Sequence, residues 1–161
     1  MPSRAPTKSS AKVLRVGIIS DTHGLLRPEA LKFLRGADHI IHAGDIGDPA
    51  ILDALRELAP VTAVRGNNDT ARWARSVPLK ANLELEGVAI HVVHDIADLR
   101  ATARVVISGH SHKPLIREED DVLYVNPGSA GPRRFTLPIS LAELRIKGGC
   151  VRARIKELAP Q

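Results

Sequence analysis

The sequence predicts an α/β fold of two mixed β-sheets with helices on the outside, and two observations lead to it. In the first half, apolar runs alternate with helical patterns in the order strand, helix, strand, helix, strand, which is typical of right-handed parallel crossovers. In the second half, short apolar runs come in pairs around turn residues, which indicates hairpins. A chain of 161 residues with 43% hydrophobic residues can bury one core. We therefore expect two sheets packed together in a single domain.

Three predicted strands in the first half each run into a polar loop. Val13–Ser20 ends at Asp21, Ile40–Ile41 leads into the sequence HAGD, and Val61–Val64 leads into the sequence RGNND. Such uninterrupted apolar runs are typical of strands that are buried on both faces. The polar loops then follow the carboxyl ends of neighbouring parallel strands, where sites assemble in α/β folds.

Two helices are expected between these strands. Residues 28–35 form the first helix, with Pro28 in its opening turn and Gly36 at its end. Asp48 and Pro49 begin the second helix as its N-cap and first residue, and apolar residues then recur on one face.

The second half is predicted to consist of strands joined mainly by tight turns. The turns are Glu86-Gly87, the acidic sequence REEDD and the sequence KGG. In the last strand, apolar and basic residues alternate, so one face is expected on a core and the other in water. The expected strands cover residues 83–85, 88–93, 105–107, 115–116, 122–125, 139–146 and 151–155.

The termini and the composition limit the classes of function that the chain can have. Residues 1–12, MPSRAPTKSSAK, are expected to form a flexible tail before a single domain over residues 13–161. No apolar stretch approaches the ~20 residues of a membrane span, so no membrane partner is expected. The single cysteine, Cys150, excludes an internal disulfide and a multi-cysteine zinc site, and it fits a reducing cytoplasm. The net charge of +5 leaves nucleic acid open as a partner, although no basic run is interleaved with aromatic residues.

Five polar groups follow the predicted strands and form a coherent set of ligand types. Asp, Asn and His offer the oxygen and nitrogen donors that suit Mn²⁺, with Fe, Zn²⁺, Co²⁺ or Ni²⁺ as alternatives. One carboxylate that bridges two ions would hold them roughly 3.5–4 Å apart, which is the spacing of two-metal hydrolases. The groups are Asp21-x-His23, Gly44-Asp45, Gly66-Asn67-Asn68-Asp69, His94 and Gly109-His110-Ser111-His112.

The sequences SDTHG, HAGD, GNND and GHSH, with the strand-end His94 and the later NPGS, resemble the calcineurin-like metallophosphoesterases, above all the small YfcE-type phosphodiesterases. The resemblance implies a four-layer α/β/β/α sandwich with two divalent ions at the strand ends. It also implies hydrolysis of a small phosphodiester, or a phosphomonoester, by in-line attack of a hydroxide that bridges the ions. It assigns Asp21, His23 and His112 to the first metal, Asp45 to the bridge, and Asn67, His94 and His110 to the second metal.

The chain departs from the family pattern at two places near the expected catalytic residues Asp45, Asn67 and Asn68. Asn68 stands where the larger family often has a histidine near the leaving group, and an amide cannot act as a general acid at neutral pH. The leaving-group proton must then come from water or another residue, or good leaving groups are favoured. His94 is followed by Asp95 and not by Gly-His, and the segment up to GHSH is short, which suggests a more open site.

Several nearby residues allow two interpretations. His91 is the rival of His94 as a ligand, but it lies three positions earlier and therefore on the other face of the strand. His42 is expected to orient a ligand before any catalytic role, and Asp69 is as consistent with a structural role as with orienting a neighbour. Three further groups could contact substrate or have structural roles only: the turn Asn126–Ser129, the pair Arg133–Arg134 and Trp73.

Two other functional classes compete with the hydrolase. A protein-interaction scaffold similar to the retromer subunit of this fold would be expected to lose ligands, whereas the set from Asp21 to His112 is complete. A nucleic-acid enzyme rests on the basic balance alone and predicts strongly salt-dependent binding. The sequence leaves a homodimer and the natural substrate open.

Overall fold

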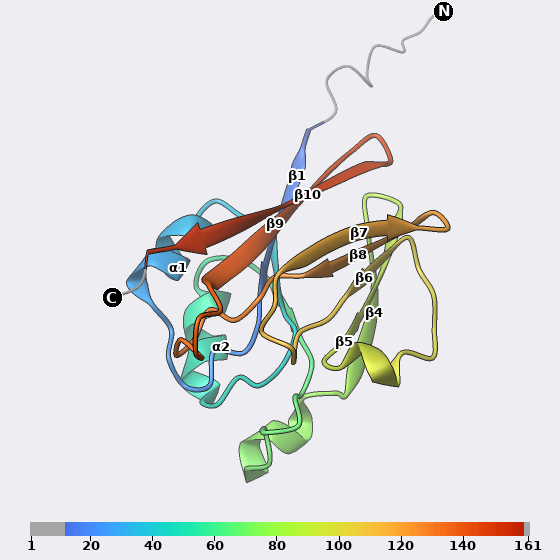
Figure 1. Ribbon diagram of the computed structural model, residues 1–161. Helices are drawn as coiled ribbons and strands as arrows, with labels where there is room; N and C mark the ends of the chain where they lie inside the picture. The colour runs from blue at the N-terminus through green and yellow to red at the C-terminus, as the bar shows by residue number, and fades with distance from the viewer. Residues whose placement is uncertain (1–11, 160–161) are drawn as a thin grey trace, which may run out of the picture.

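The computed structural model describes residues 12–159, which form two five-stranded mixed sheets packed face to face (Figure 1). The expected tail lies outside the described residues apart from Lys12. None of the described helices has the length and apolar character needed to cross a membrane. Sheet A has the order β10-β9-β1-β2-β3, and sheet B has the order β4-β5-β6-β8-β7.

Sheet A contains the three parallel strands that the first half of the sequence predicts. They are extended by the last hairpin, because β9 pairs antiparallel with β1. The strands are β1 (Leu14–Ile19), β2 (His39–His42), β3 (Val61–Ala63), β9 (Ile139–Lys147) and β10 (Cys150–Leu158).

Two helices connect the parallel strands and cover the outer face of sheet A, as predicted. Helix α1 (Pro28–Leu34) begins with its proline in the first turn. Helix α2 (Pro49–Arg56) is capped by Asp48, whose carboxylate accepts a 2.9 Å hydrogen bond from the Ala50 N–H. The fully buried Leu34 of α1 and Leu55 of α2 belong to an apolar cluster on this face of the sheet.

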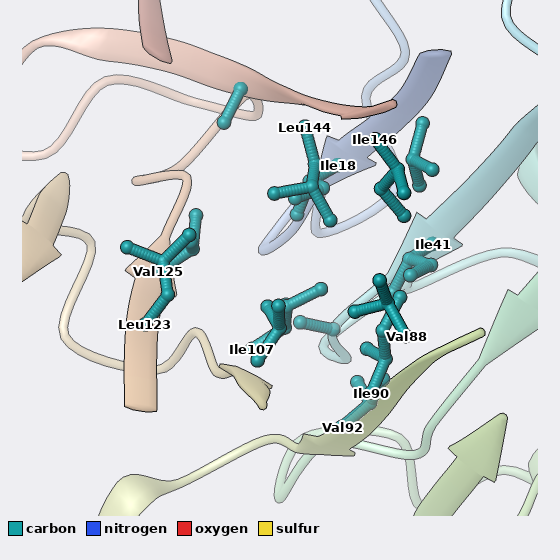
Figure 2. Close-up of a cluster of buried hydrophobic side chains, with 14 of the residues drawn as sticks. Ile18, Ile41, Val88, Ile90, Val92, Ile107, Leu123, Val125, Leu144 and Ile146 are labelled. Atoms are coloured by element: carbon teal, nitrogen blue, oxygen red, sulfur yellow. The ribbon is translucent and has the colours of Figure 1, made fainter. Parts of the chain in front are cut away.

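The main core lies between the two sheets and is aliphatic (Figure 2). Branched side chains from the facing strands interdigitate there, and this packing fixes which face of each strand turns inward. Sheet A contributes Ile18, Ile41, Leu144 and Ile146, and sheet B contributes Val88, Ile90, Val92, Ile107, Leu123 and Val125.

Sheet B combines two predicted hairpins with parallel pairs of β6 with β5 and with β8. Its edge strand β7 includes three residues of the predicted acidic turn, because an exposed edge strand tolerates charged side chains. The actual turn is Asp120-Asp121, where both residues have positive φ. The strands are β4 (Lys80–Leu85), β5 (Val88–Val93), β6 (Val105–Ile107), β7 (Leu115–Glu119) and β8 (Val122–Asn126).

The predicted α/β/β/α class is confirmed, but the fourth layer is thin. The connection from β5 to the parallel β6 contains one 3₁₀ turn, η3 (Ile96–Asp98), and no longer helix. The β3–β4 connection likewise contains a 3₁₀ turn, η2 (Arg72–Ser76). The short segment after His94 therefore covers little of the site, as its length in the sequence suggests.

Candidate metal centre

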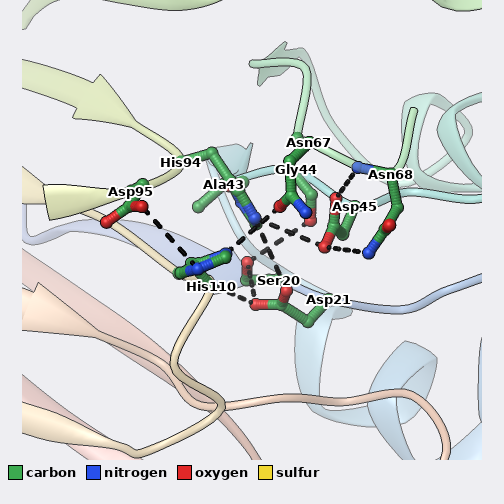
Figure 3. A network of polar contacts seen from close by, with 12 residues as sticks. Ser20, Asp21, Ala43, Gly44, Asp45, Asn67, Asn68, His94, Asp95 and His110 are labelled. Carbon is green, nitrogen blue, oxygen red and sulfur yellow. Dashed lines mark hydrogen bonds and ion pairs between the residues drawn. The ribbon is translucent and has the colours of Figure 1, made fainter. Parts of the chain in front are cut away.

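Loops from both sheets converge at the carboxyl ends of five strands, and the predicted ligands lie on them (Figure 3). Because parallel strands end at a shared edge, residues separated by up to 91 positions in the chain meet there. β1 is followed by Asp21 and His23, β2 by Asp45, β3 by Asn67 and Asn68, β5 by His94, and β6 by His110 and His112.

Asp21, His23 and His112 form one compact group of donor atoms. Asp21 Oδ1 lies 3.4 Å from His112 Nε2 and 3.8 Å from His23 Nε2. The two imidazole Nε2 atoms are 3.3 Å apart. These three residues could hold one cation between a buried carboxylate and two nitrogen donors.

Asp45 and His94 form a second group beside the first. Asp45 Oδ2 lies 3.3 Å from His94 Nε2 and 3.7 Å from His23 Nε2, so this oxygen faces both groups. Asp21 Oδ1 is also 3.9 Å from His94 Nε2, so Asp21 belongs to the second group as well as to the first. Two buried carboxylates therefore lie between the two sets of histidines, and each of them faces both sets.

Asn67 and His110 lie together at the more exposed rim of the site. Asn67 Oδ1 is 3.1 Å from His110 Nδ1, and the other ring nitrogen, Nε2, is 3.6 Å from Asp95 Oδ2. The His110 side chain is 44% exposed and lies outside the two compact groups. The structure thus brings all seven predicted ligands to one place, five of them tightly and these two more loosely.

The site passes a direct test of whether it fits metal ions. Asp21 Oδ1 and His94 Nε2 are buried and have no hydrogen-bond partner among the described residues. Buried polar atoms are normally satisfied, because leaving them bare costs free energy. His94 Nδ1 lies 2.7 Å from the Ala43 carbonyl oxygen, to which it donates its proton, so the Nε2 lone pair faces the other ligands. Divalent ions would satisfy these atoms.

The two carboxylates are held in place by donors from neighbouring loops. Asp21 Oδ2 accepts hydrogen bonds from Ser20 Oγ at 2.7 Å and from the His110 N–H at 3.0 Å. Asp45 Oδ1 accepts from the Asn68 N–H at 2.8 Å, and Oδ2 accepts from the Asn68 side-chain amide at 3.0 Å. In this structure Asn68 therefore fixes the orientation of Asp45.

Charge and burial oppose each other at Asp45 and His94. Burial raises the pKa of the Asp45 carboxyl, but the neighbouring His94 and the Asn68 N–H outweigh it, so the pKa lies below its usual range. Burial lowers the pKa of His94, but Asp45 and the Ala43 carbonyl raise it more. The Asp45 carboxyl is therefore ionised at neutral pH.

Left-handed backbone conformations bring the ligands inward. Such φ values cost about 1–3 kcal/mol for a non-glycine residue and cluster at functional sites. Gly66 has a different role: a Cβ on it would lie 2.1 Å from Asp45 Oδ1, so only glycine allows this approach. The strained residues are Asp21 (φ 55°), His23 (45°), Asp45 (56°), His110 (72°) and His112 (65°).

His42 joins the loops after β1 and β2 and does not face the metal ligands' donor atoms. Its Nδ1 accepts from the Gly44 N–H at 3.1 Å, so the proton is assigned to Nε2, which lies 3.0 Å from Thr22 Oγ1. Complete burial lowers the pKa of His42 to about 4 and keeps the ring neutral. His42 therefore supports the two loops through its contacts with the Gly44 N–H and Thr22 Oγ1.

Asp69 and the NPGS sequence are structural supports of the same loops. Asn126 Nδ2 donates to the Gly109 carbonyl at 3.0 Å, and Ser129 Oγ donates to the Asp21 carbonyl at 2.9 Å. These two hydrogen bonds link β8 and the turn after it to the loops that carry His110 and Asp21. No local feature of the sequence predicts this supporting role. The Asp69 carboxylate accepts hydrogen bonds from the backbone N–H groups of Ile46, Gly47 and Gly66.

The remaining candidates lie apart from the ligands. His91 Nδ1 is 2.7 Å from Asn82 Oδ1 on the neighbouring strand β4, whereas His94 belongs to the site. Trp73 packs against the apolar cluster on the helical side of sheet A. Arg133 and Arg134 are exposed, and Arg133 Nε donates to the Leu137 carbonyl at 3.3 Å.

Comparison with known proteins agrees with this geometry. The chain is 39% identical over 157 residues to a "probable metallophosphoesterase" of Methanothermobacter thermautotrophicus, covering 87% of this chain and 90% of that protein. It is 28% identical over 139 residues to a phosphodiesterase of Methanocaldococcus jannaschii, covering 71% of this chain and 83% of that protein.

Solved structures with the same fold include an archaeal phosphodiesterase and Vps29 proteins. An archaeal phosphodiesterase matches with a TM-score of 0.71 at 24% identity, covering 88% of this chain and 99% of that chain. Vps29 of Chaetomium thermophilum matches with a TM-score of 0.73 at 21% identity, covering 90% and 97%. The family model of the calcineurin-like phosphoesterase superfamily domain matches residues 14–149, and the chain belongs to this superfamily.

Proposed function

We propose that this chain is a phosphodiesterase that works with two divalent ions, with Mn²⁺ as the first candidate. One observation carries the proposal: two buried carboxylates lie between two sets of histidines, and some of their donor atoms are bare. Membership of the phosphoesterase superfamily supplies the reaction class.

The proposed ligand sets follow the two groups of the site. Asp45 is shared, which is supported by the position of its Oδ2 between His23 and His94. Asn67 and His110 would move inward from the rim to complete the second set. The first set is Asp21, His23, His112 and the shared Asp45, and the second is Asp45, Asn67, His94 and His110.

The protein's contribution to the reaction is largely positioning. When bound, the two ions would neutralise phosphate oxygens and supply hydroxide from water near neutral pH. Asp45 would be a ligand of both ions, Asn68 holds Asp45, and the Ala43 carbonyl orients His94. The Asn68 amide cannot protonate a leaving group. Esters with good leaving groups should therefore react fastest.

The direct test uses purified protein, Mn²⁺ and bis(4-nitrophenyl) phosphate. We expect metal-dependent release of nitrophenolate that stops on chelation and returns when Mn²⁺ is restored. The monoester 4-nitrophenyl phosphate, assayed in parallel, reports whether the site also accepts monoesters. The absence of turnover with every one of Mn²⁺, Co²⁺, Ni²⁺, Zn²⁺ and Fe²⁺ would refute the proposal that the chain is a phosphodiesterase.

The only support for the scaffold alternative is the fold that the chain shares with Vps29. At 21% identity this likeness shows the fold and not the function. A Vps29 of Entamoeba histolytica was solved with Zn²⁺, so a metal site alone does not separate the two classes, and the hydrolase is favoured by the phosphoesterase relatives of this chain. Bound metal without hydrolysis, together with a stable protein partner in pull-downs, would support the scaffold.

A further inference from the structure

A cavity of about 320 Å³ adjoins the proposed metal centre on the side of its second ligand set. Asn67 and His94, which also lie at the metal centre (Figure 3), are among the residues that line the cavity. Its lining also includes Arg65, which follows β3, and Lys80, the first residue of β4. A substrate with its phosphate at the metal centre could therefore extend one ester substituent into this space.

Arg65 is the unusual residue in this wall. Its side chain is partly buried, and its Nε is buried with no hydrogen-bond partner among the described residues. It makes no ion pair with any residue of the 12–159 range, and its backbone N–H donates to the Pro78 carbonyl at 2.8 Å. The buried Nε has lost hydration without gaining a partner, which costs free energy, and the guanidinium beside the cavity carries a positive charge that no carboxylate of the described residues pairs. Such a group indicates an anionic ligand.

The carboxylates near the cavity do not meet this need. Asp95 Oδ1 accepts a 3.0 Å hydrogen bond from the Ala97 N–H, and its Oδ2 faces His110. Asp98 is exposed on η3, so water screens its charge, and Lys80 is exposed as well. Arg65 is thus the partly buried cation on the cavity wall, and it has no ion pair among the described residues.

We propose that Arg65 binds a second anionic group of the substrate, a carboxylate or phosphate carried on one ester substituent, and so determines specificity. This inference rests on the proposed function, because it places the scissile phosphate at the metal centre. The planar guanidinium matches both anions in geometry and charge. The cavity of about 320 Å³ has room for a small substituent.

Binding without turnover provides the first test. Propylphosphonate and 3-phosphonopropionate differ only in a terminal methyl against a carboxylate, and their phosphonate can occupy the metal centre. Calorimetry on the Mn²⁺-loaded protein should show that the preference for the carboxylate compound, as a ratio of the two Kd values, is at least tenfold larger in wild type than in Arg65→Met. Arg65→Met should remove this preference, Arg65→Lys should keep part of it, and the exposed Arg72→Met should retain it.

Turnover provides the second test. Propyl 4-nitrophenyl phosphate and 2-carboxyethyl 4-nitrophenyl phosphate release the same chromophore and differ in the same way. Wild type should show a lower KM for the carboxylate ester, and Arg65→Met should raise that KM while leaving kcat and bound Mn²⁺ unchanged. Equal preference in wild type and Arg65→Met would overturn the role of Arg65. Failure to hydrolyse either ester, with the binding preference intact, would count against the proposed function alone.

Discussion

Replacing Asn68 with alanine separates a positioning role from a catalytic one. The side-chain amide donates one 3.0 Å hydrogen bond to Asp45 Oδ2, while the backbone N–H of the same residue donates at 2.8 Å to Oδ1. Alanine removes the first bond and keeps the second. A hydrogen bond to a charged group is worth about 1.5–3 kcal/mol, and partners behind a metal ligand typically change metal affinity about 10–100-fold. We therefore expect Asn68→Ala to weaken Mn²⁺ binding by roughly this factor.

The assay measures Mn²⁺ affinity by calorimetry and then kcat for bis(4-nitrophenyl) phosphate at saturating Mn²⁺. Because the amide acts through Asp45, kcat at full metal loading should stay within about threefold of wild type. Unchanged Mn²⁺ affinity with a large loss of kcat at saturation would refute the positioning role.

Three further changes test other parts of the account. Gly66→Ala should keep the fold but displace Asp45, because Asp45 Oδ1 would lie 2.1 Å from the new Cβ. Calorimetry should therefore show weaker Mn²⁺ binding by this variant. Mn²⁺ affinity equal to that of wild type would contradict the close approach. His94→Ala should lose Mn²⁺ and activity, whereas the matched variant His91→Ala should keep both. Metal analysis and the phosphodiesterase assay measure the two properties. Equal losses in the two variants would contradict the choice of His94 over His91 as a ligand. Glu143→Gln should destabilise the fold by about 1–3 kcal/mol at pH 7, because this carboxylate accepts hydrogen bonds from Arg15 and Arg154. Burial raises the pKa of Glu143, but both arginines lower it below its ordinary value of 4.5, so its contribution is present above that value and lost as pH falls. Urea unfolding should show the difference shrinking towards pH 4, and a difference constant with pH would contradict this origin.

The order of elements and the convergence of the ligands could be predicted from the sequence because both depend on local signals. Buried parallel strands need apolar runs, and the residue after each run lies at the shared edge whatever the details of packing. Asp21 and His112 could thus be expected at one site although they are far apart in the chain. Proline in the first turn of α1 and Asp48 as the cap of α2 are local signals of the same kind.

Other features of the site depend on contacts that the sequence does not encode locally. Asn68 stands at the position where the family often has a residue near the leaving group. Its side-chain amide nevertheless donates to Asp45, which lies in the loop after β2. Asn126 and Ser129 support ligand loops only because the sandwich brings the turn after β8 beside them. The left-handed φ of Asp45 is likewise imposed by its surroundings, since no glycine signal marks that position.

The thin fourth layer and the edge strand β7 show the limits of reading elements from composition. Charged residues such as Glu118 and Glu119 favour a turn when considered alone, but at a sheet edge they form part of a strand and discourage further pairing. The short segment after β5 folds into η3 and leaves the rim at His110 exposed. An open rim is consistent with selection of substrates by groups beside the metals, such as Arg65.

The central claim is a two-ion centre that shares Asp45, and the number of Mn²⁺ ions bound per chain tests it most directly. Titration of metal-free wild type, followed by calorimetry and checked by elemental analysis, should give two Mn²⁺ per chain. Asp45→Asn should bind no more than one, because the shared oxygen loses its charge. One ion in wild type, or two ions and full activity in Asp45→Asn, would contradict the account.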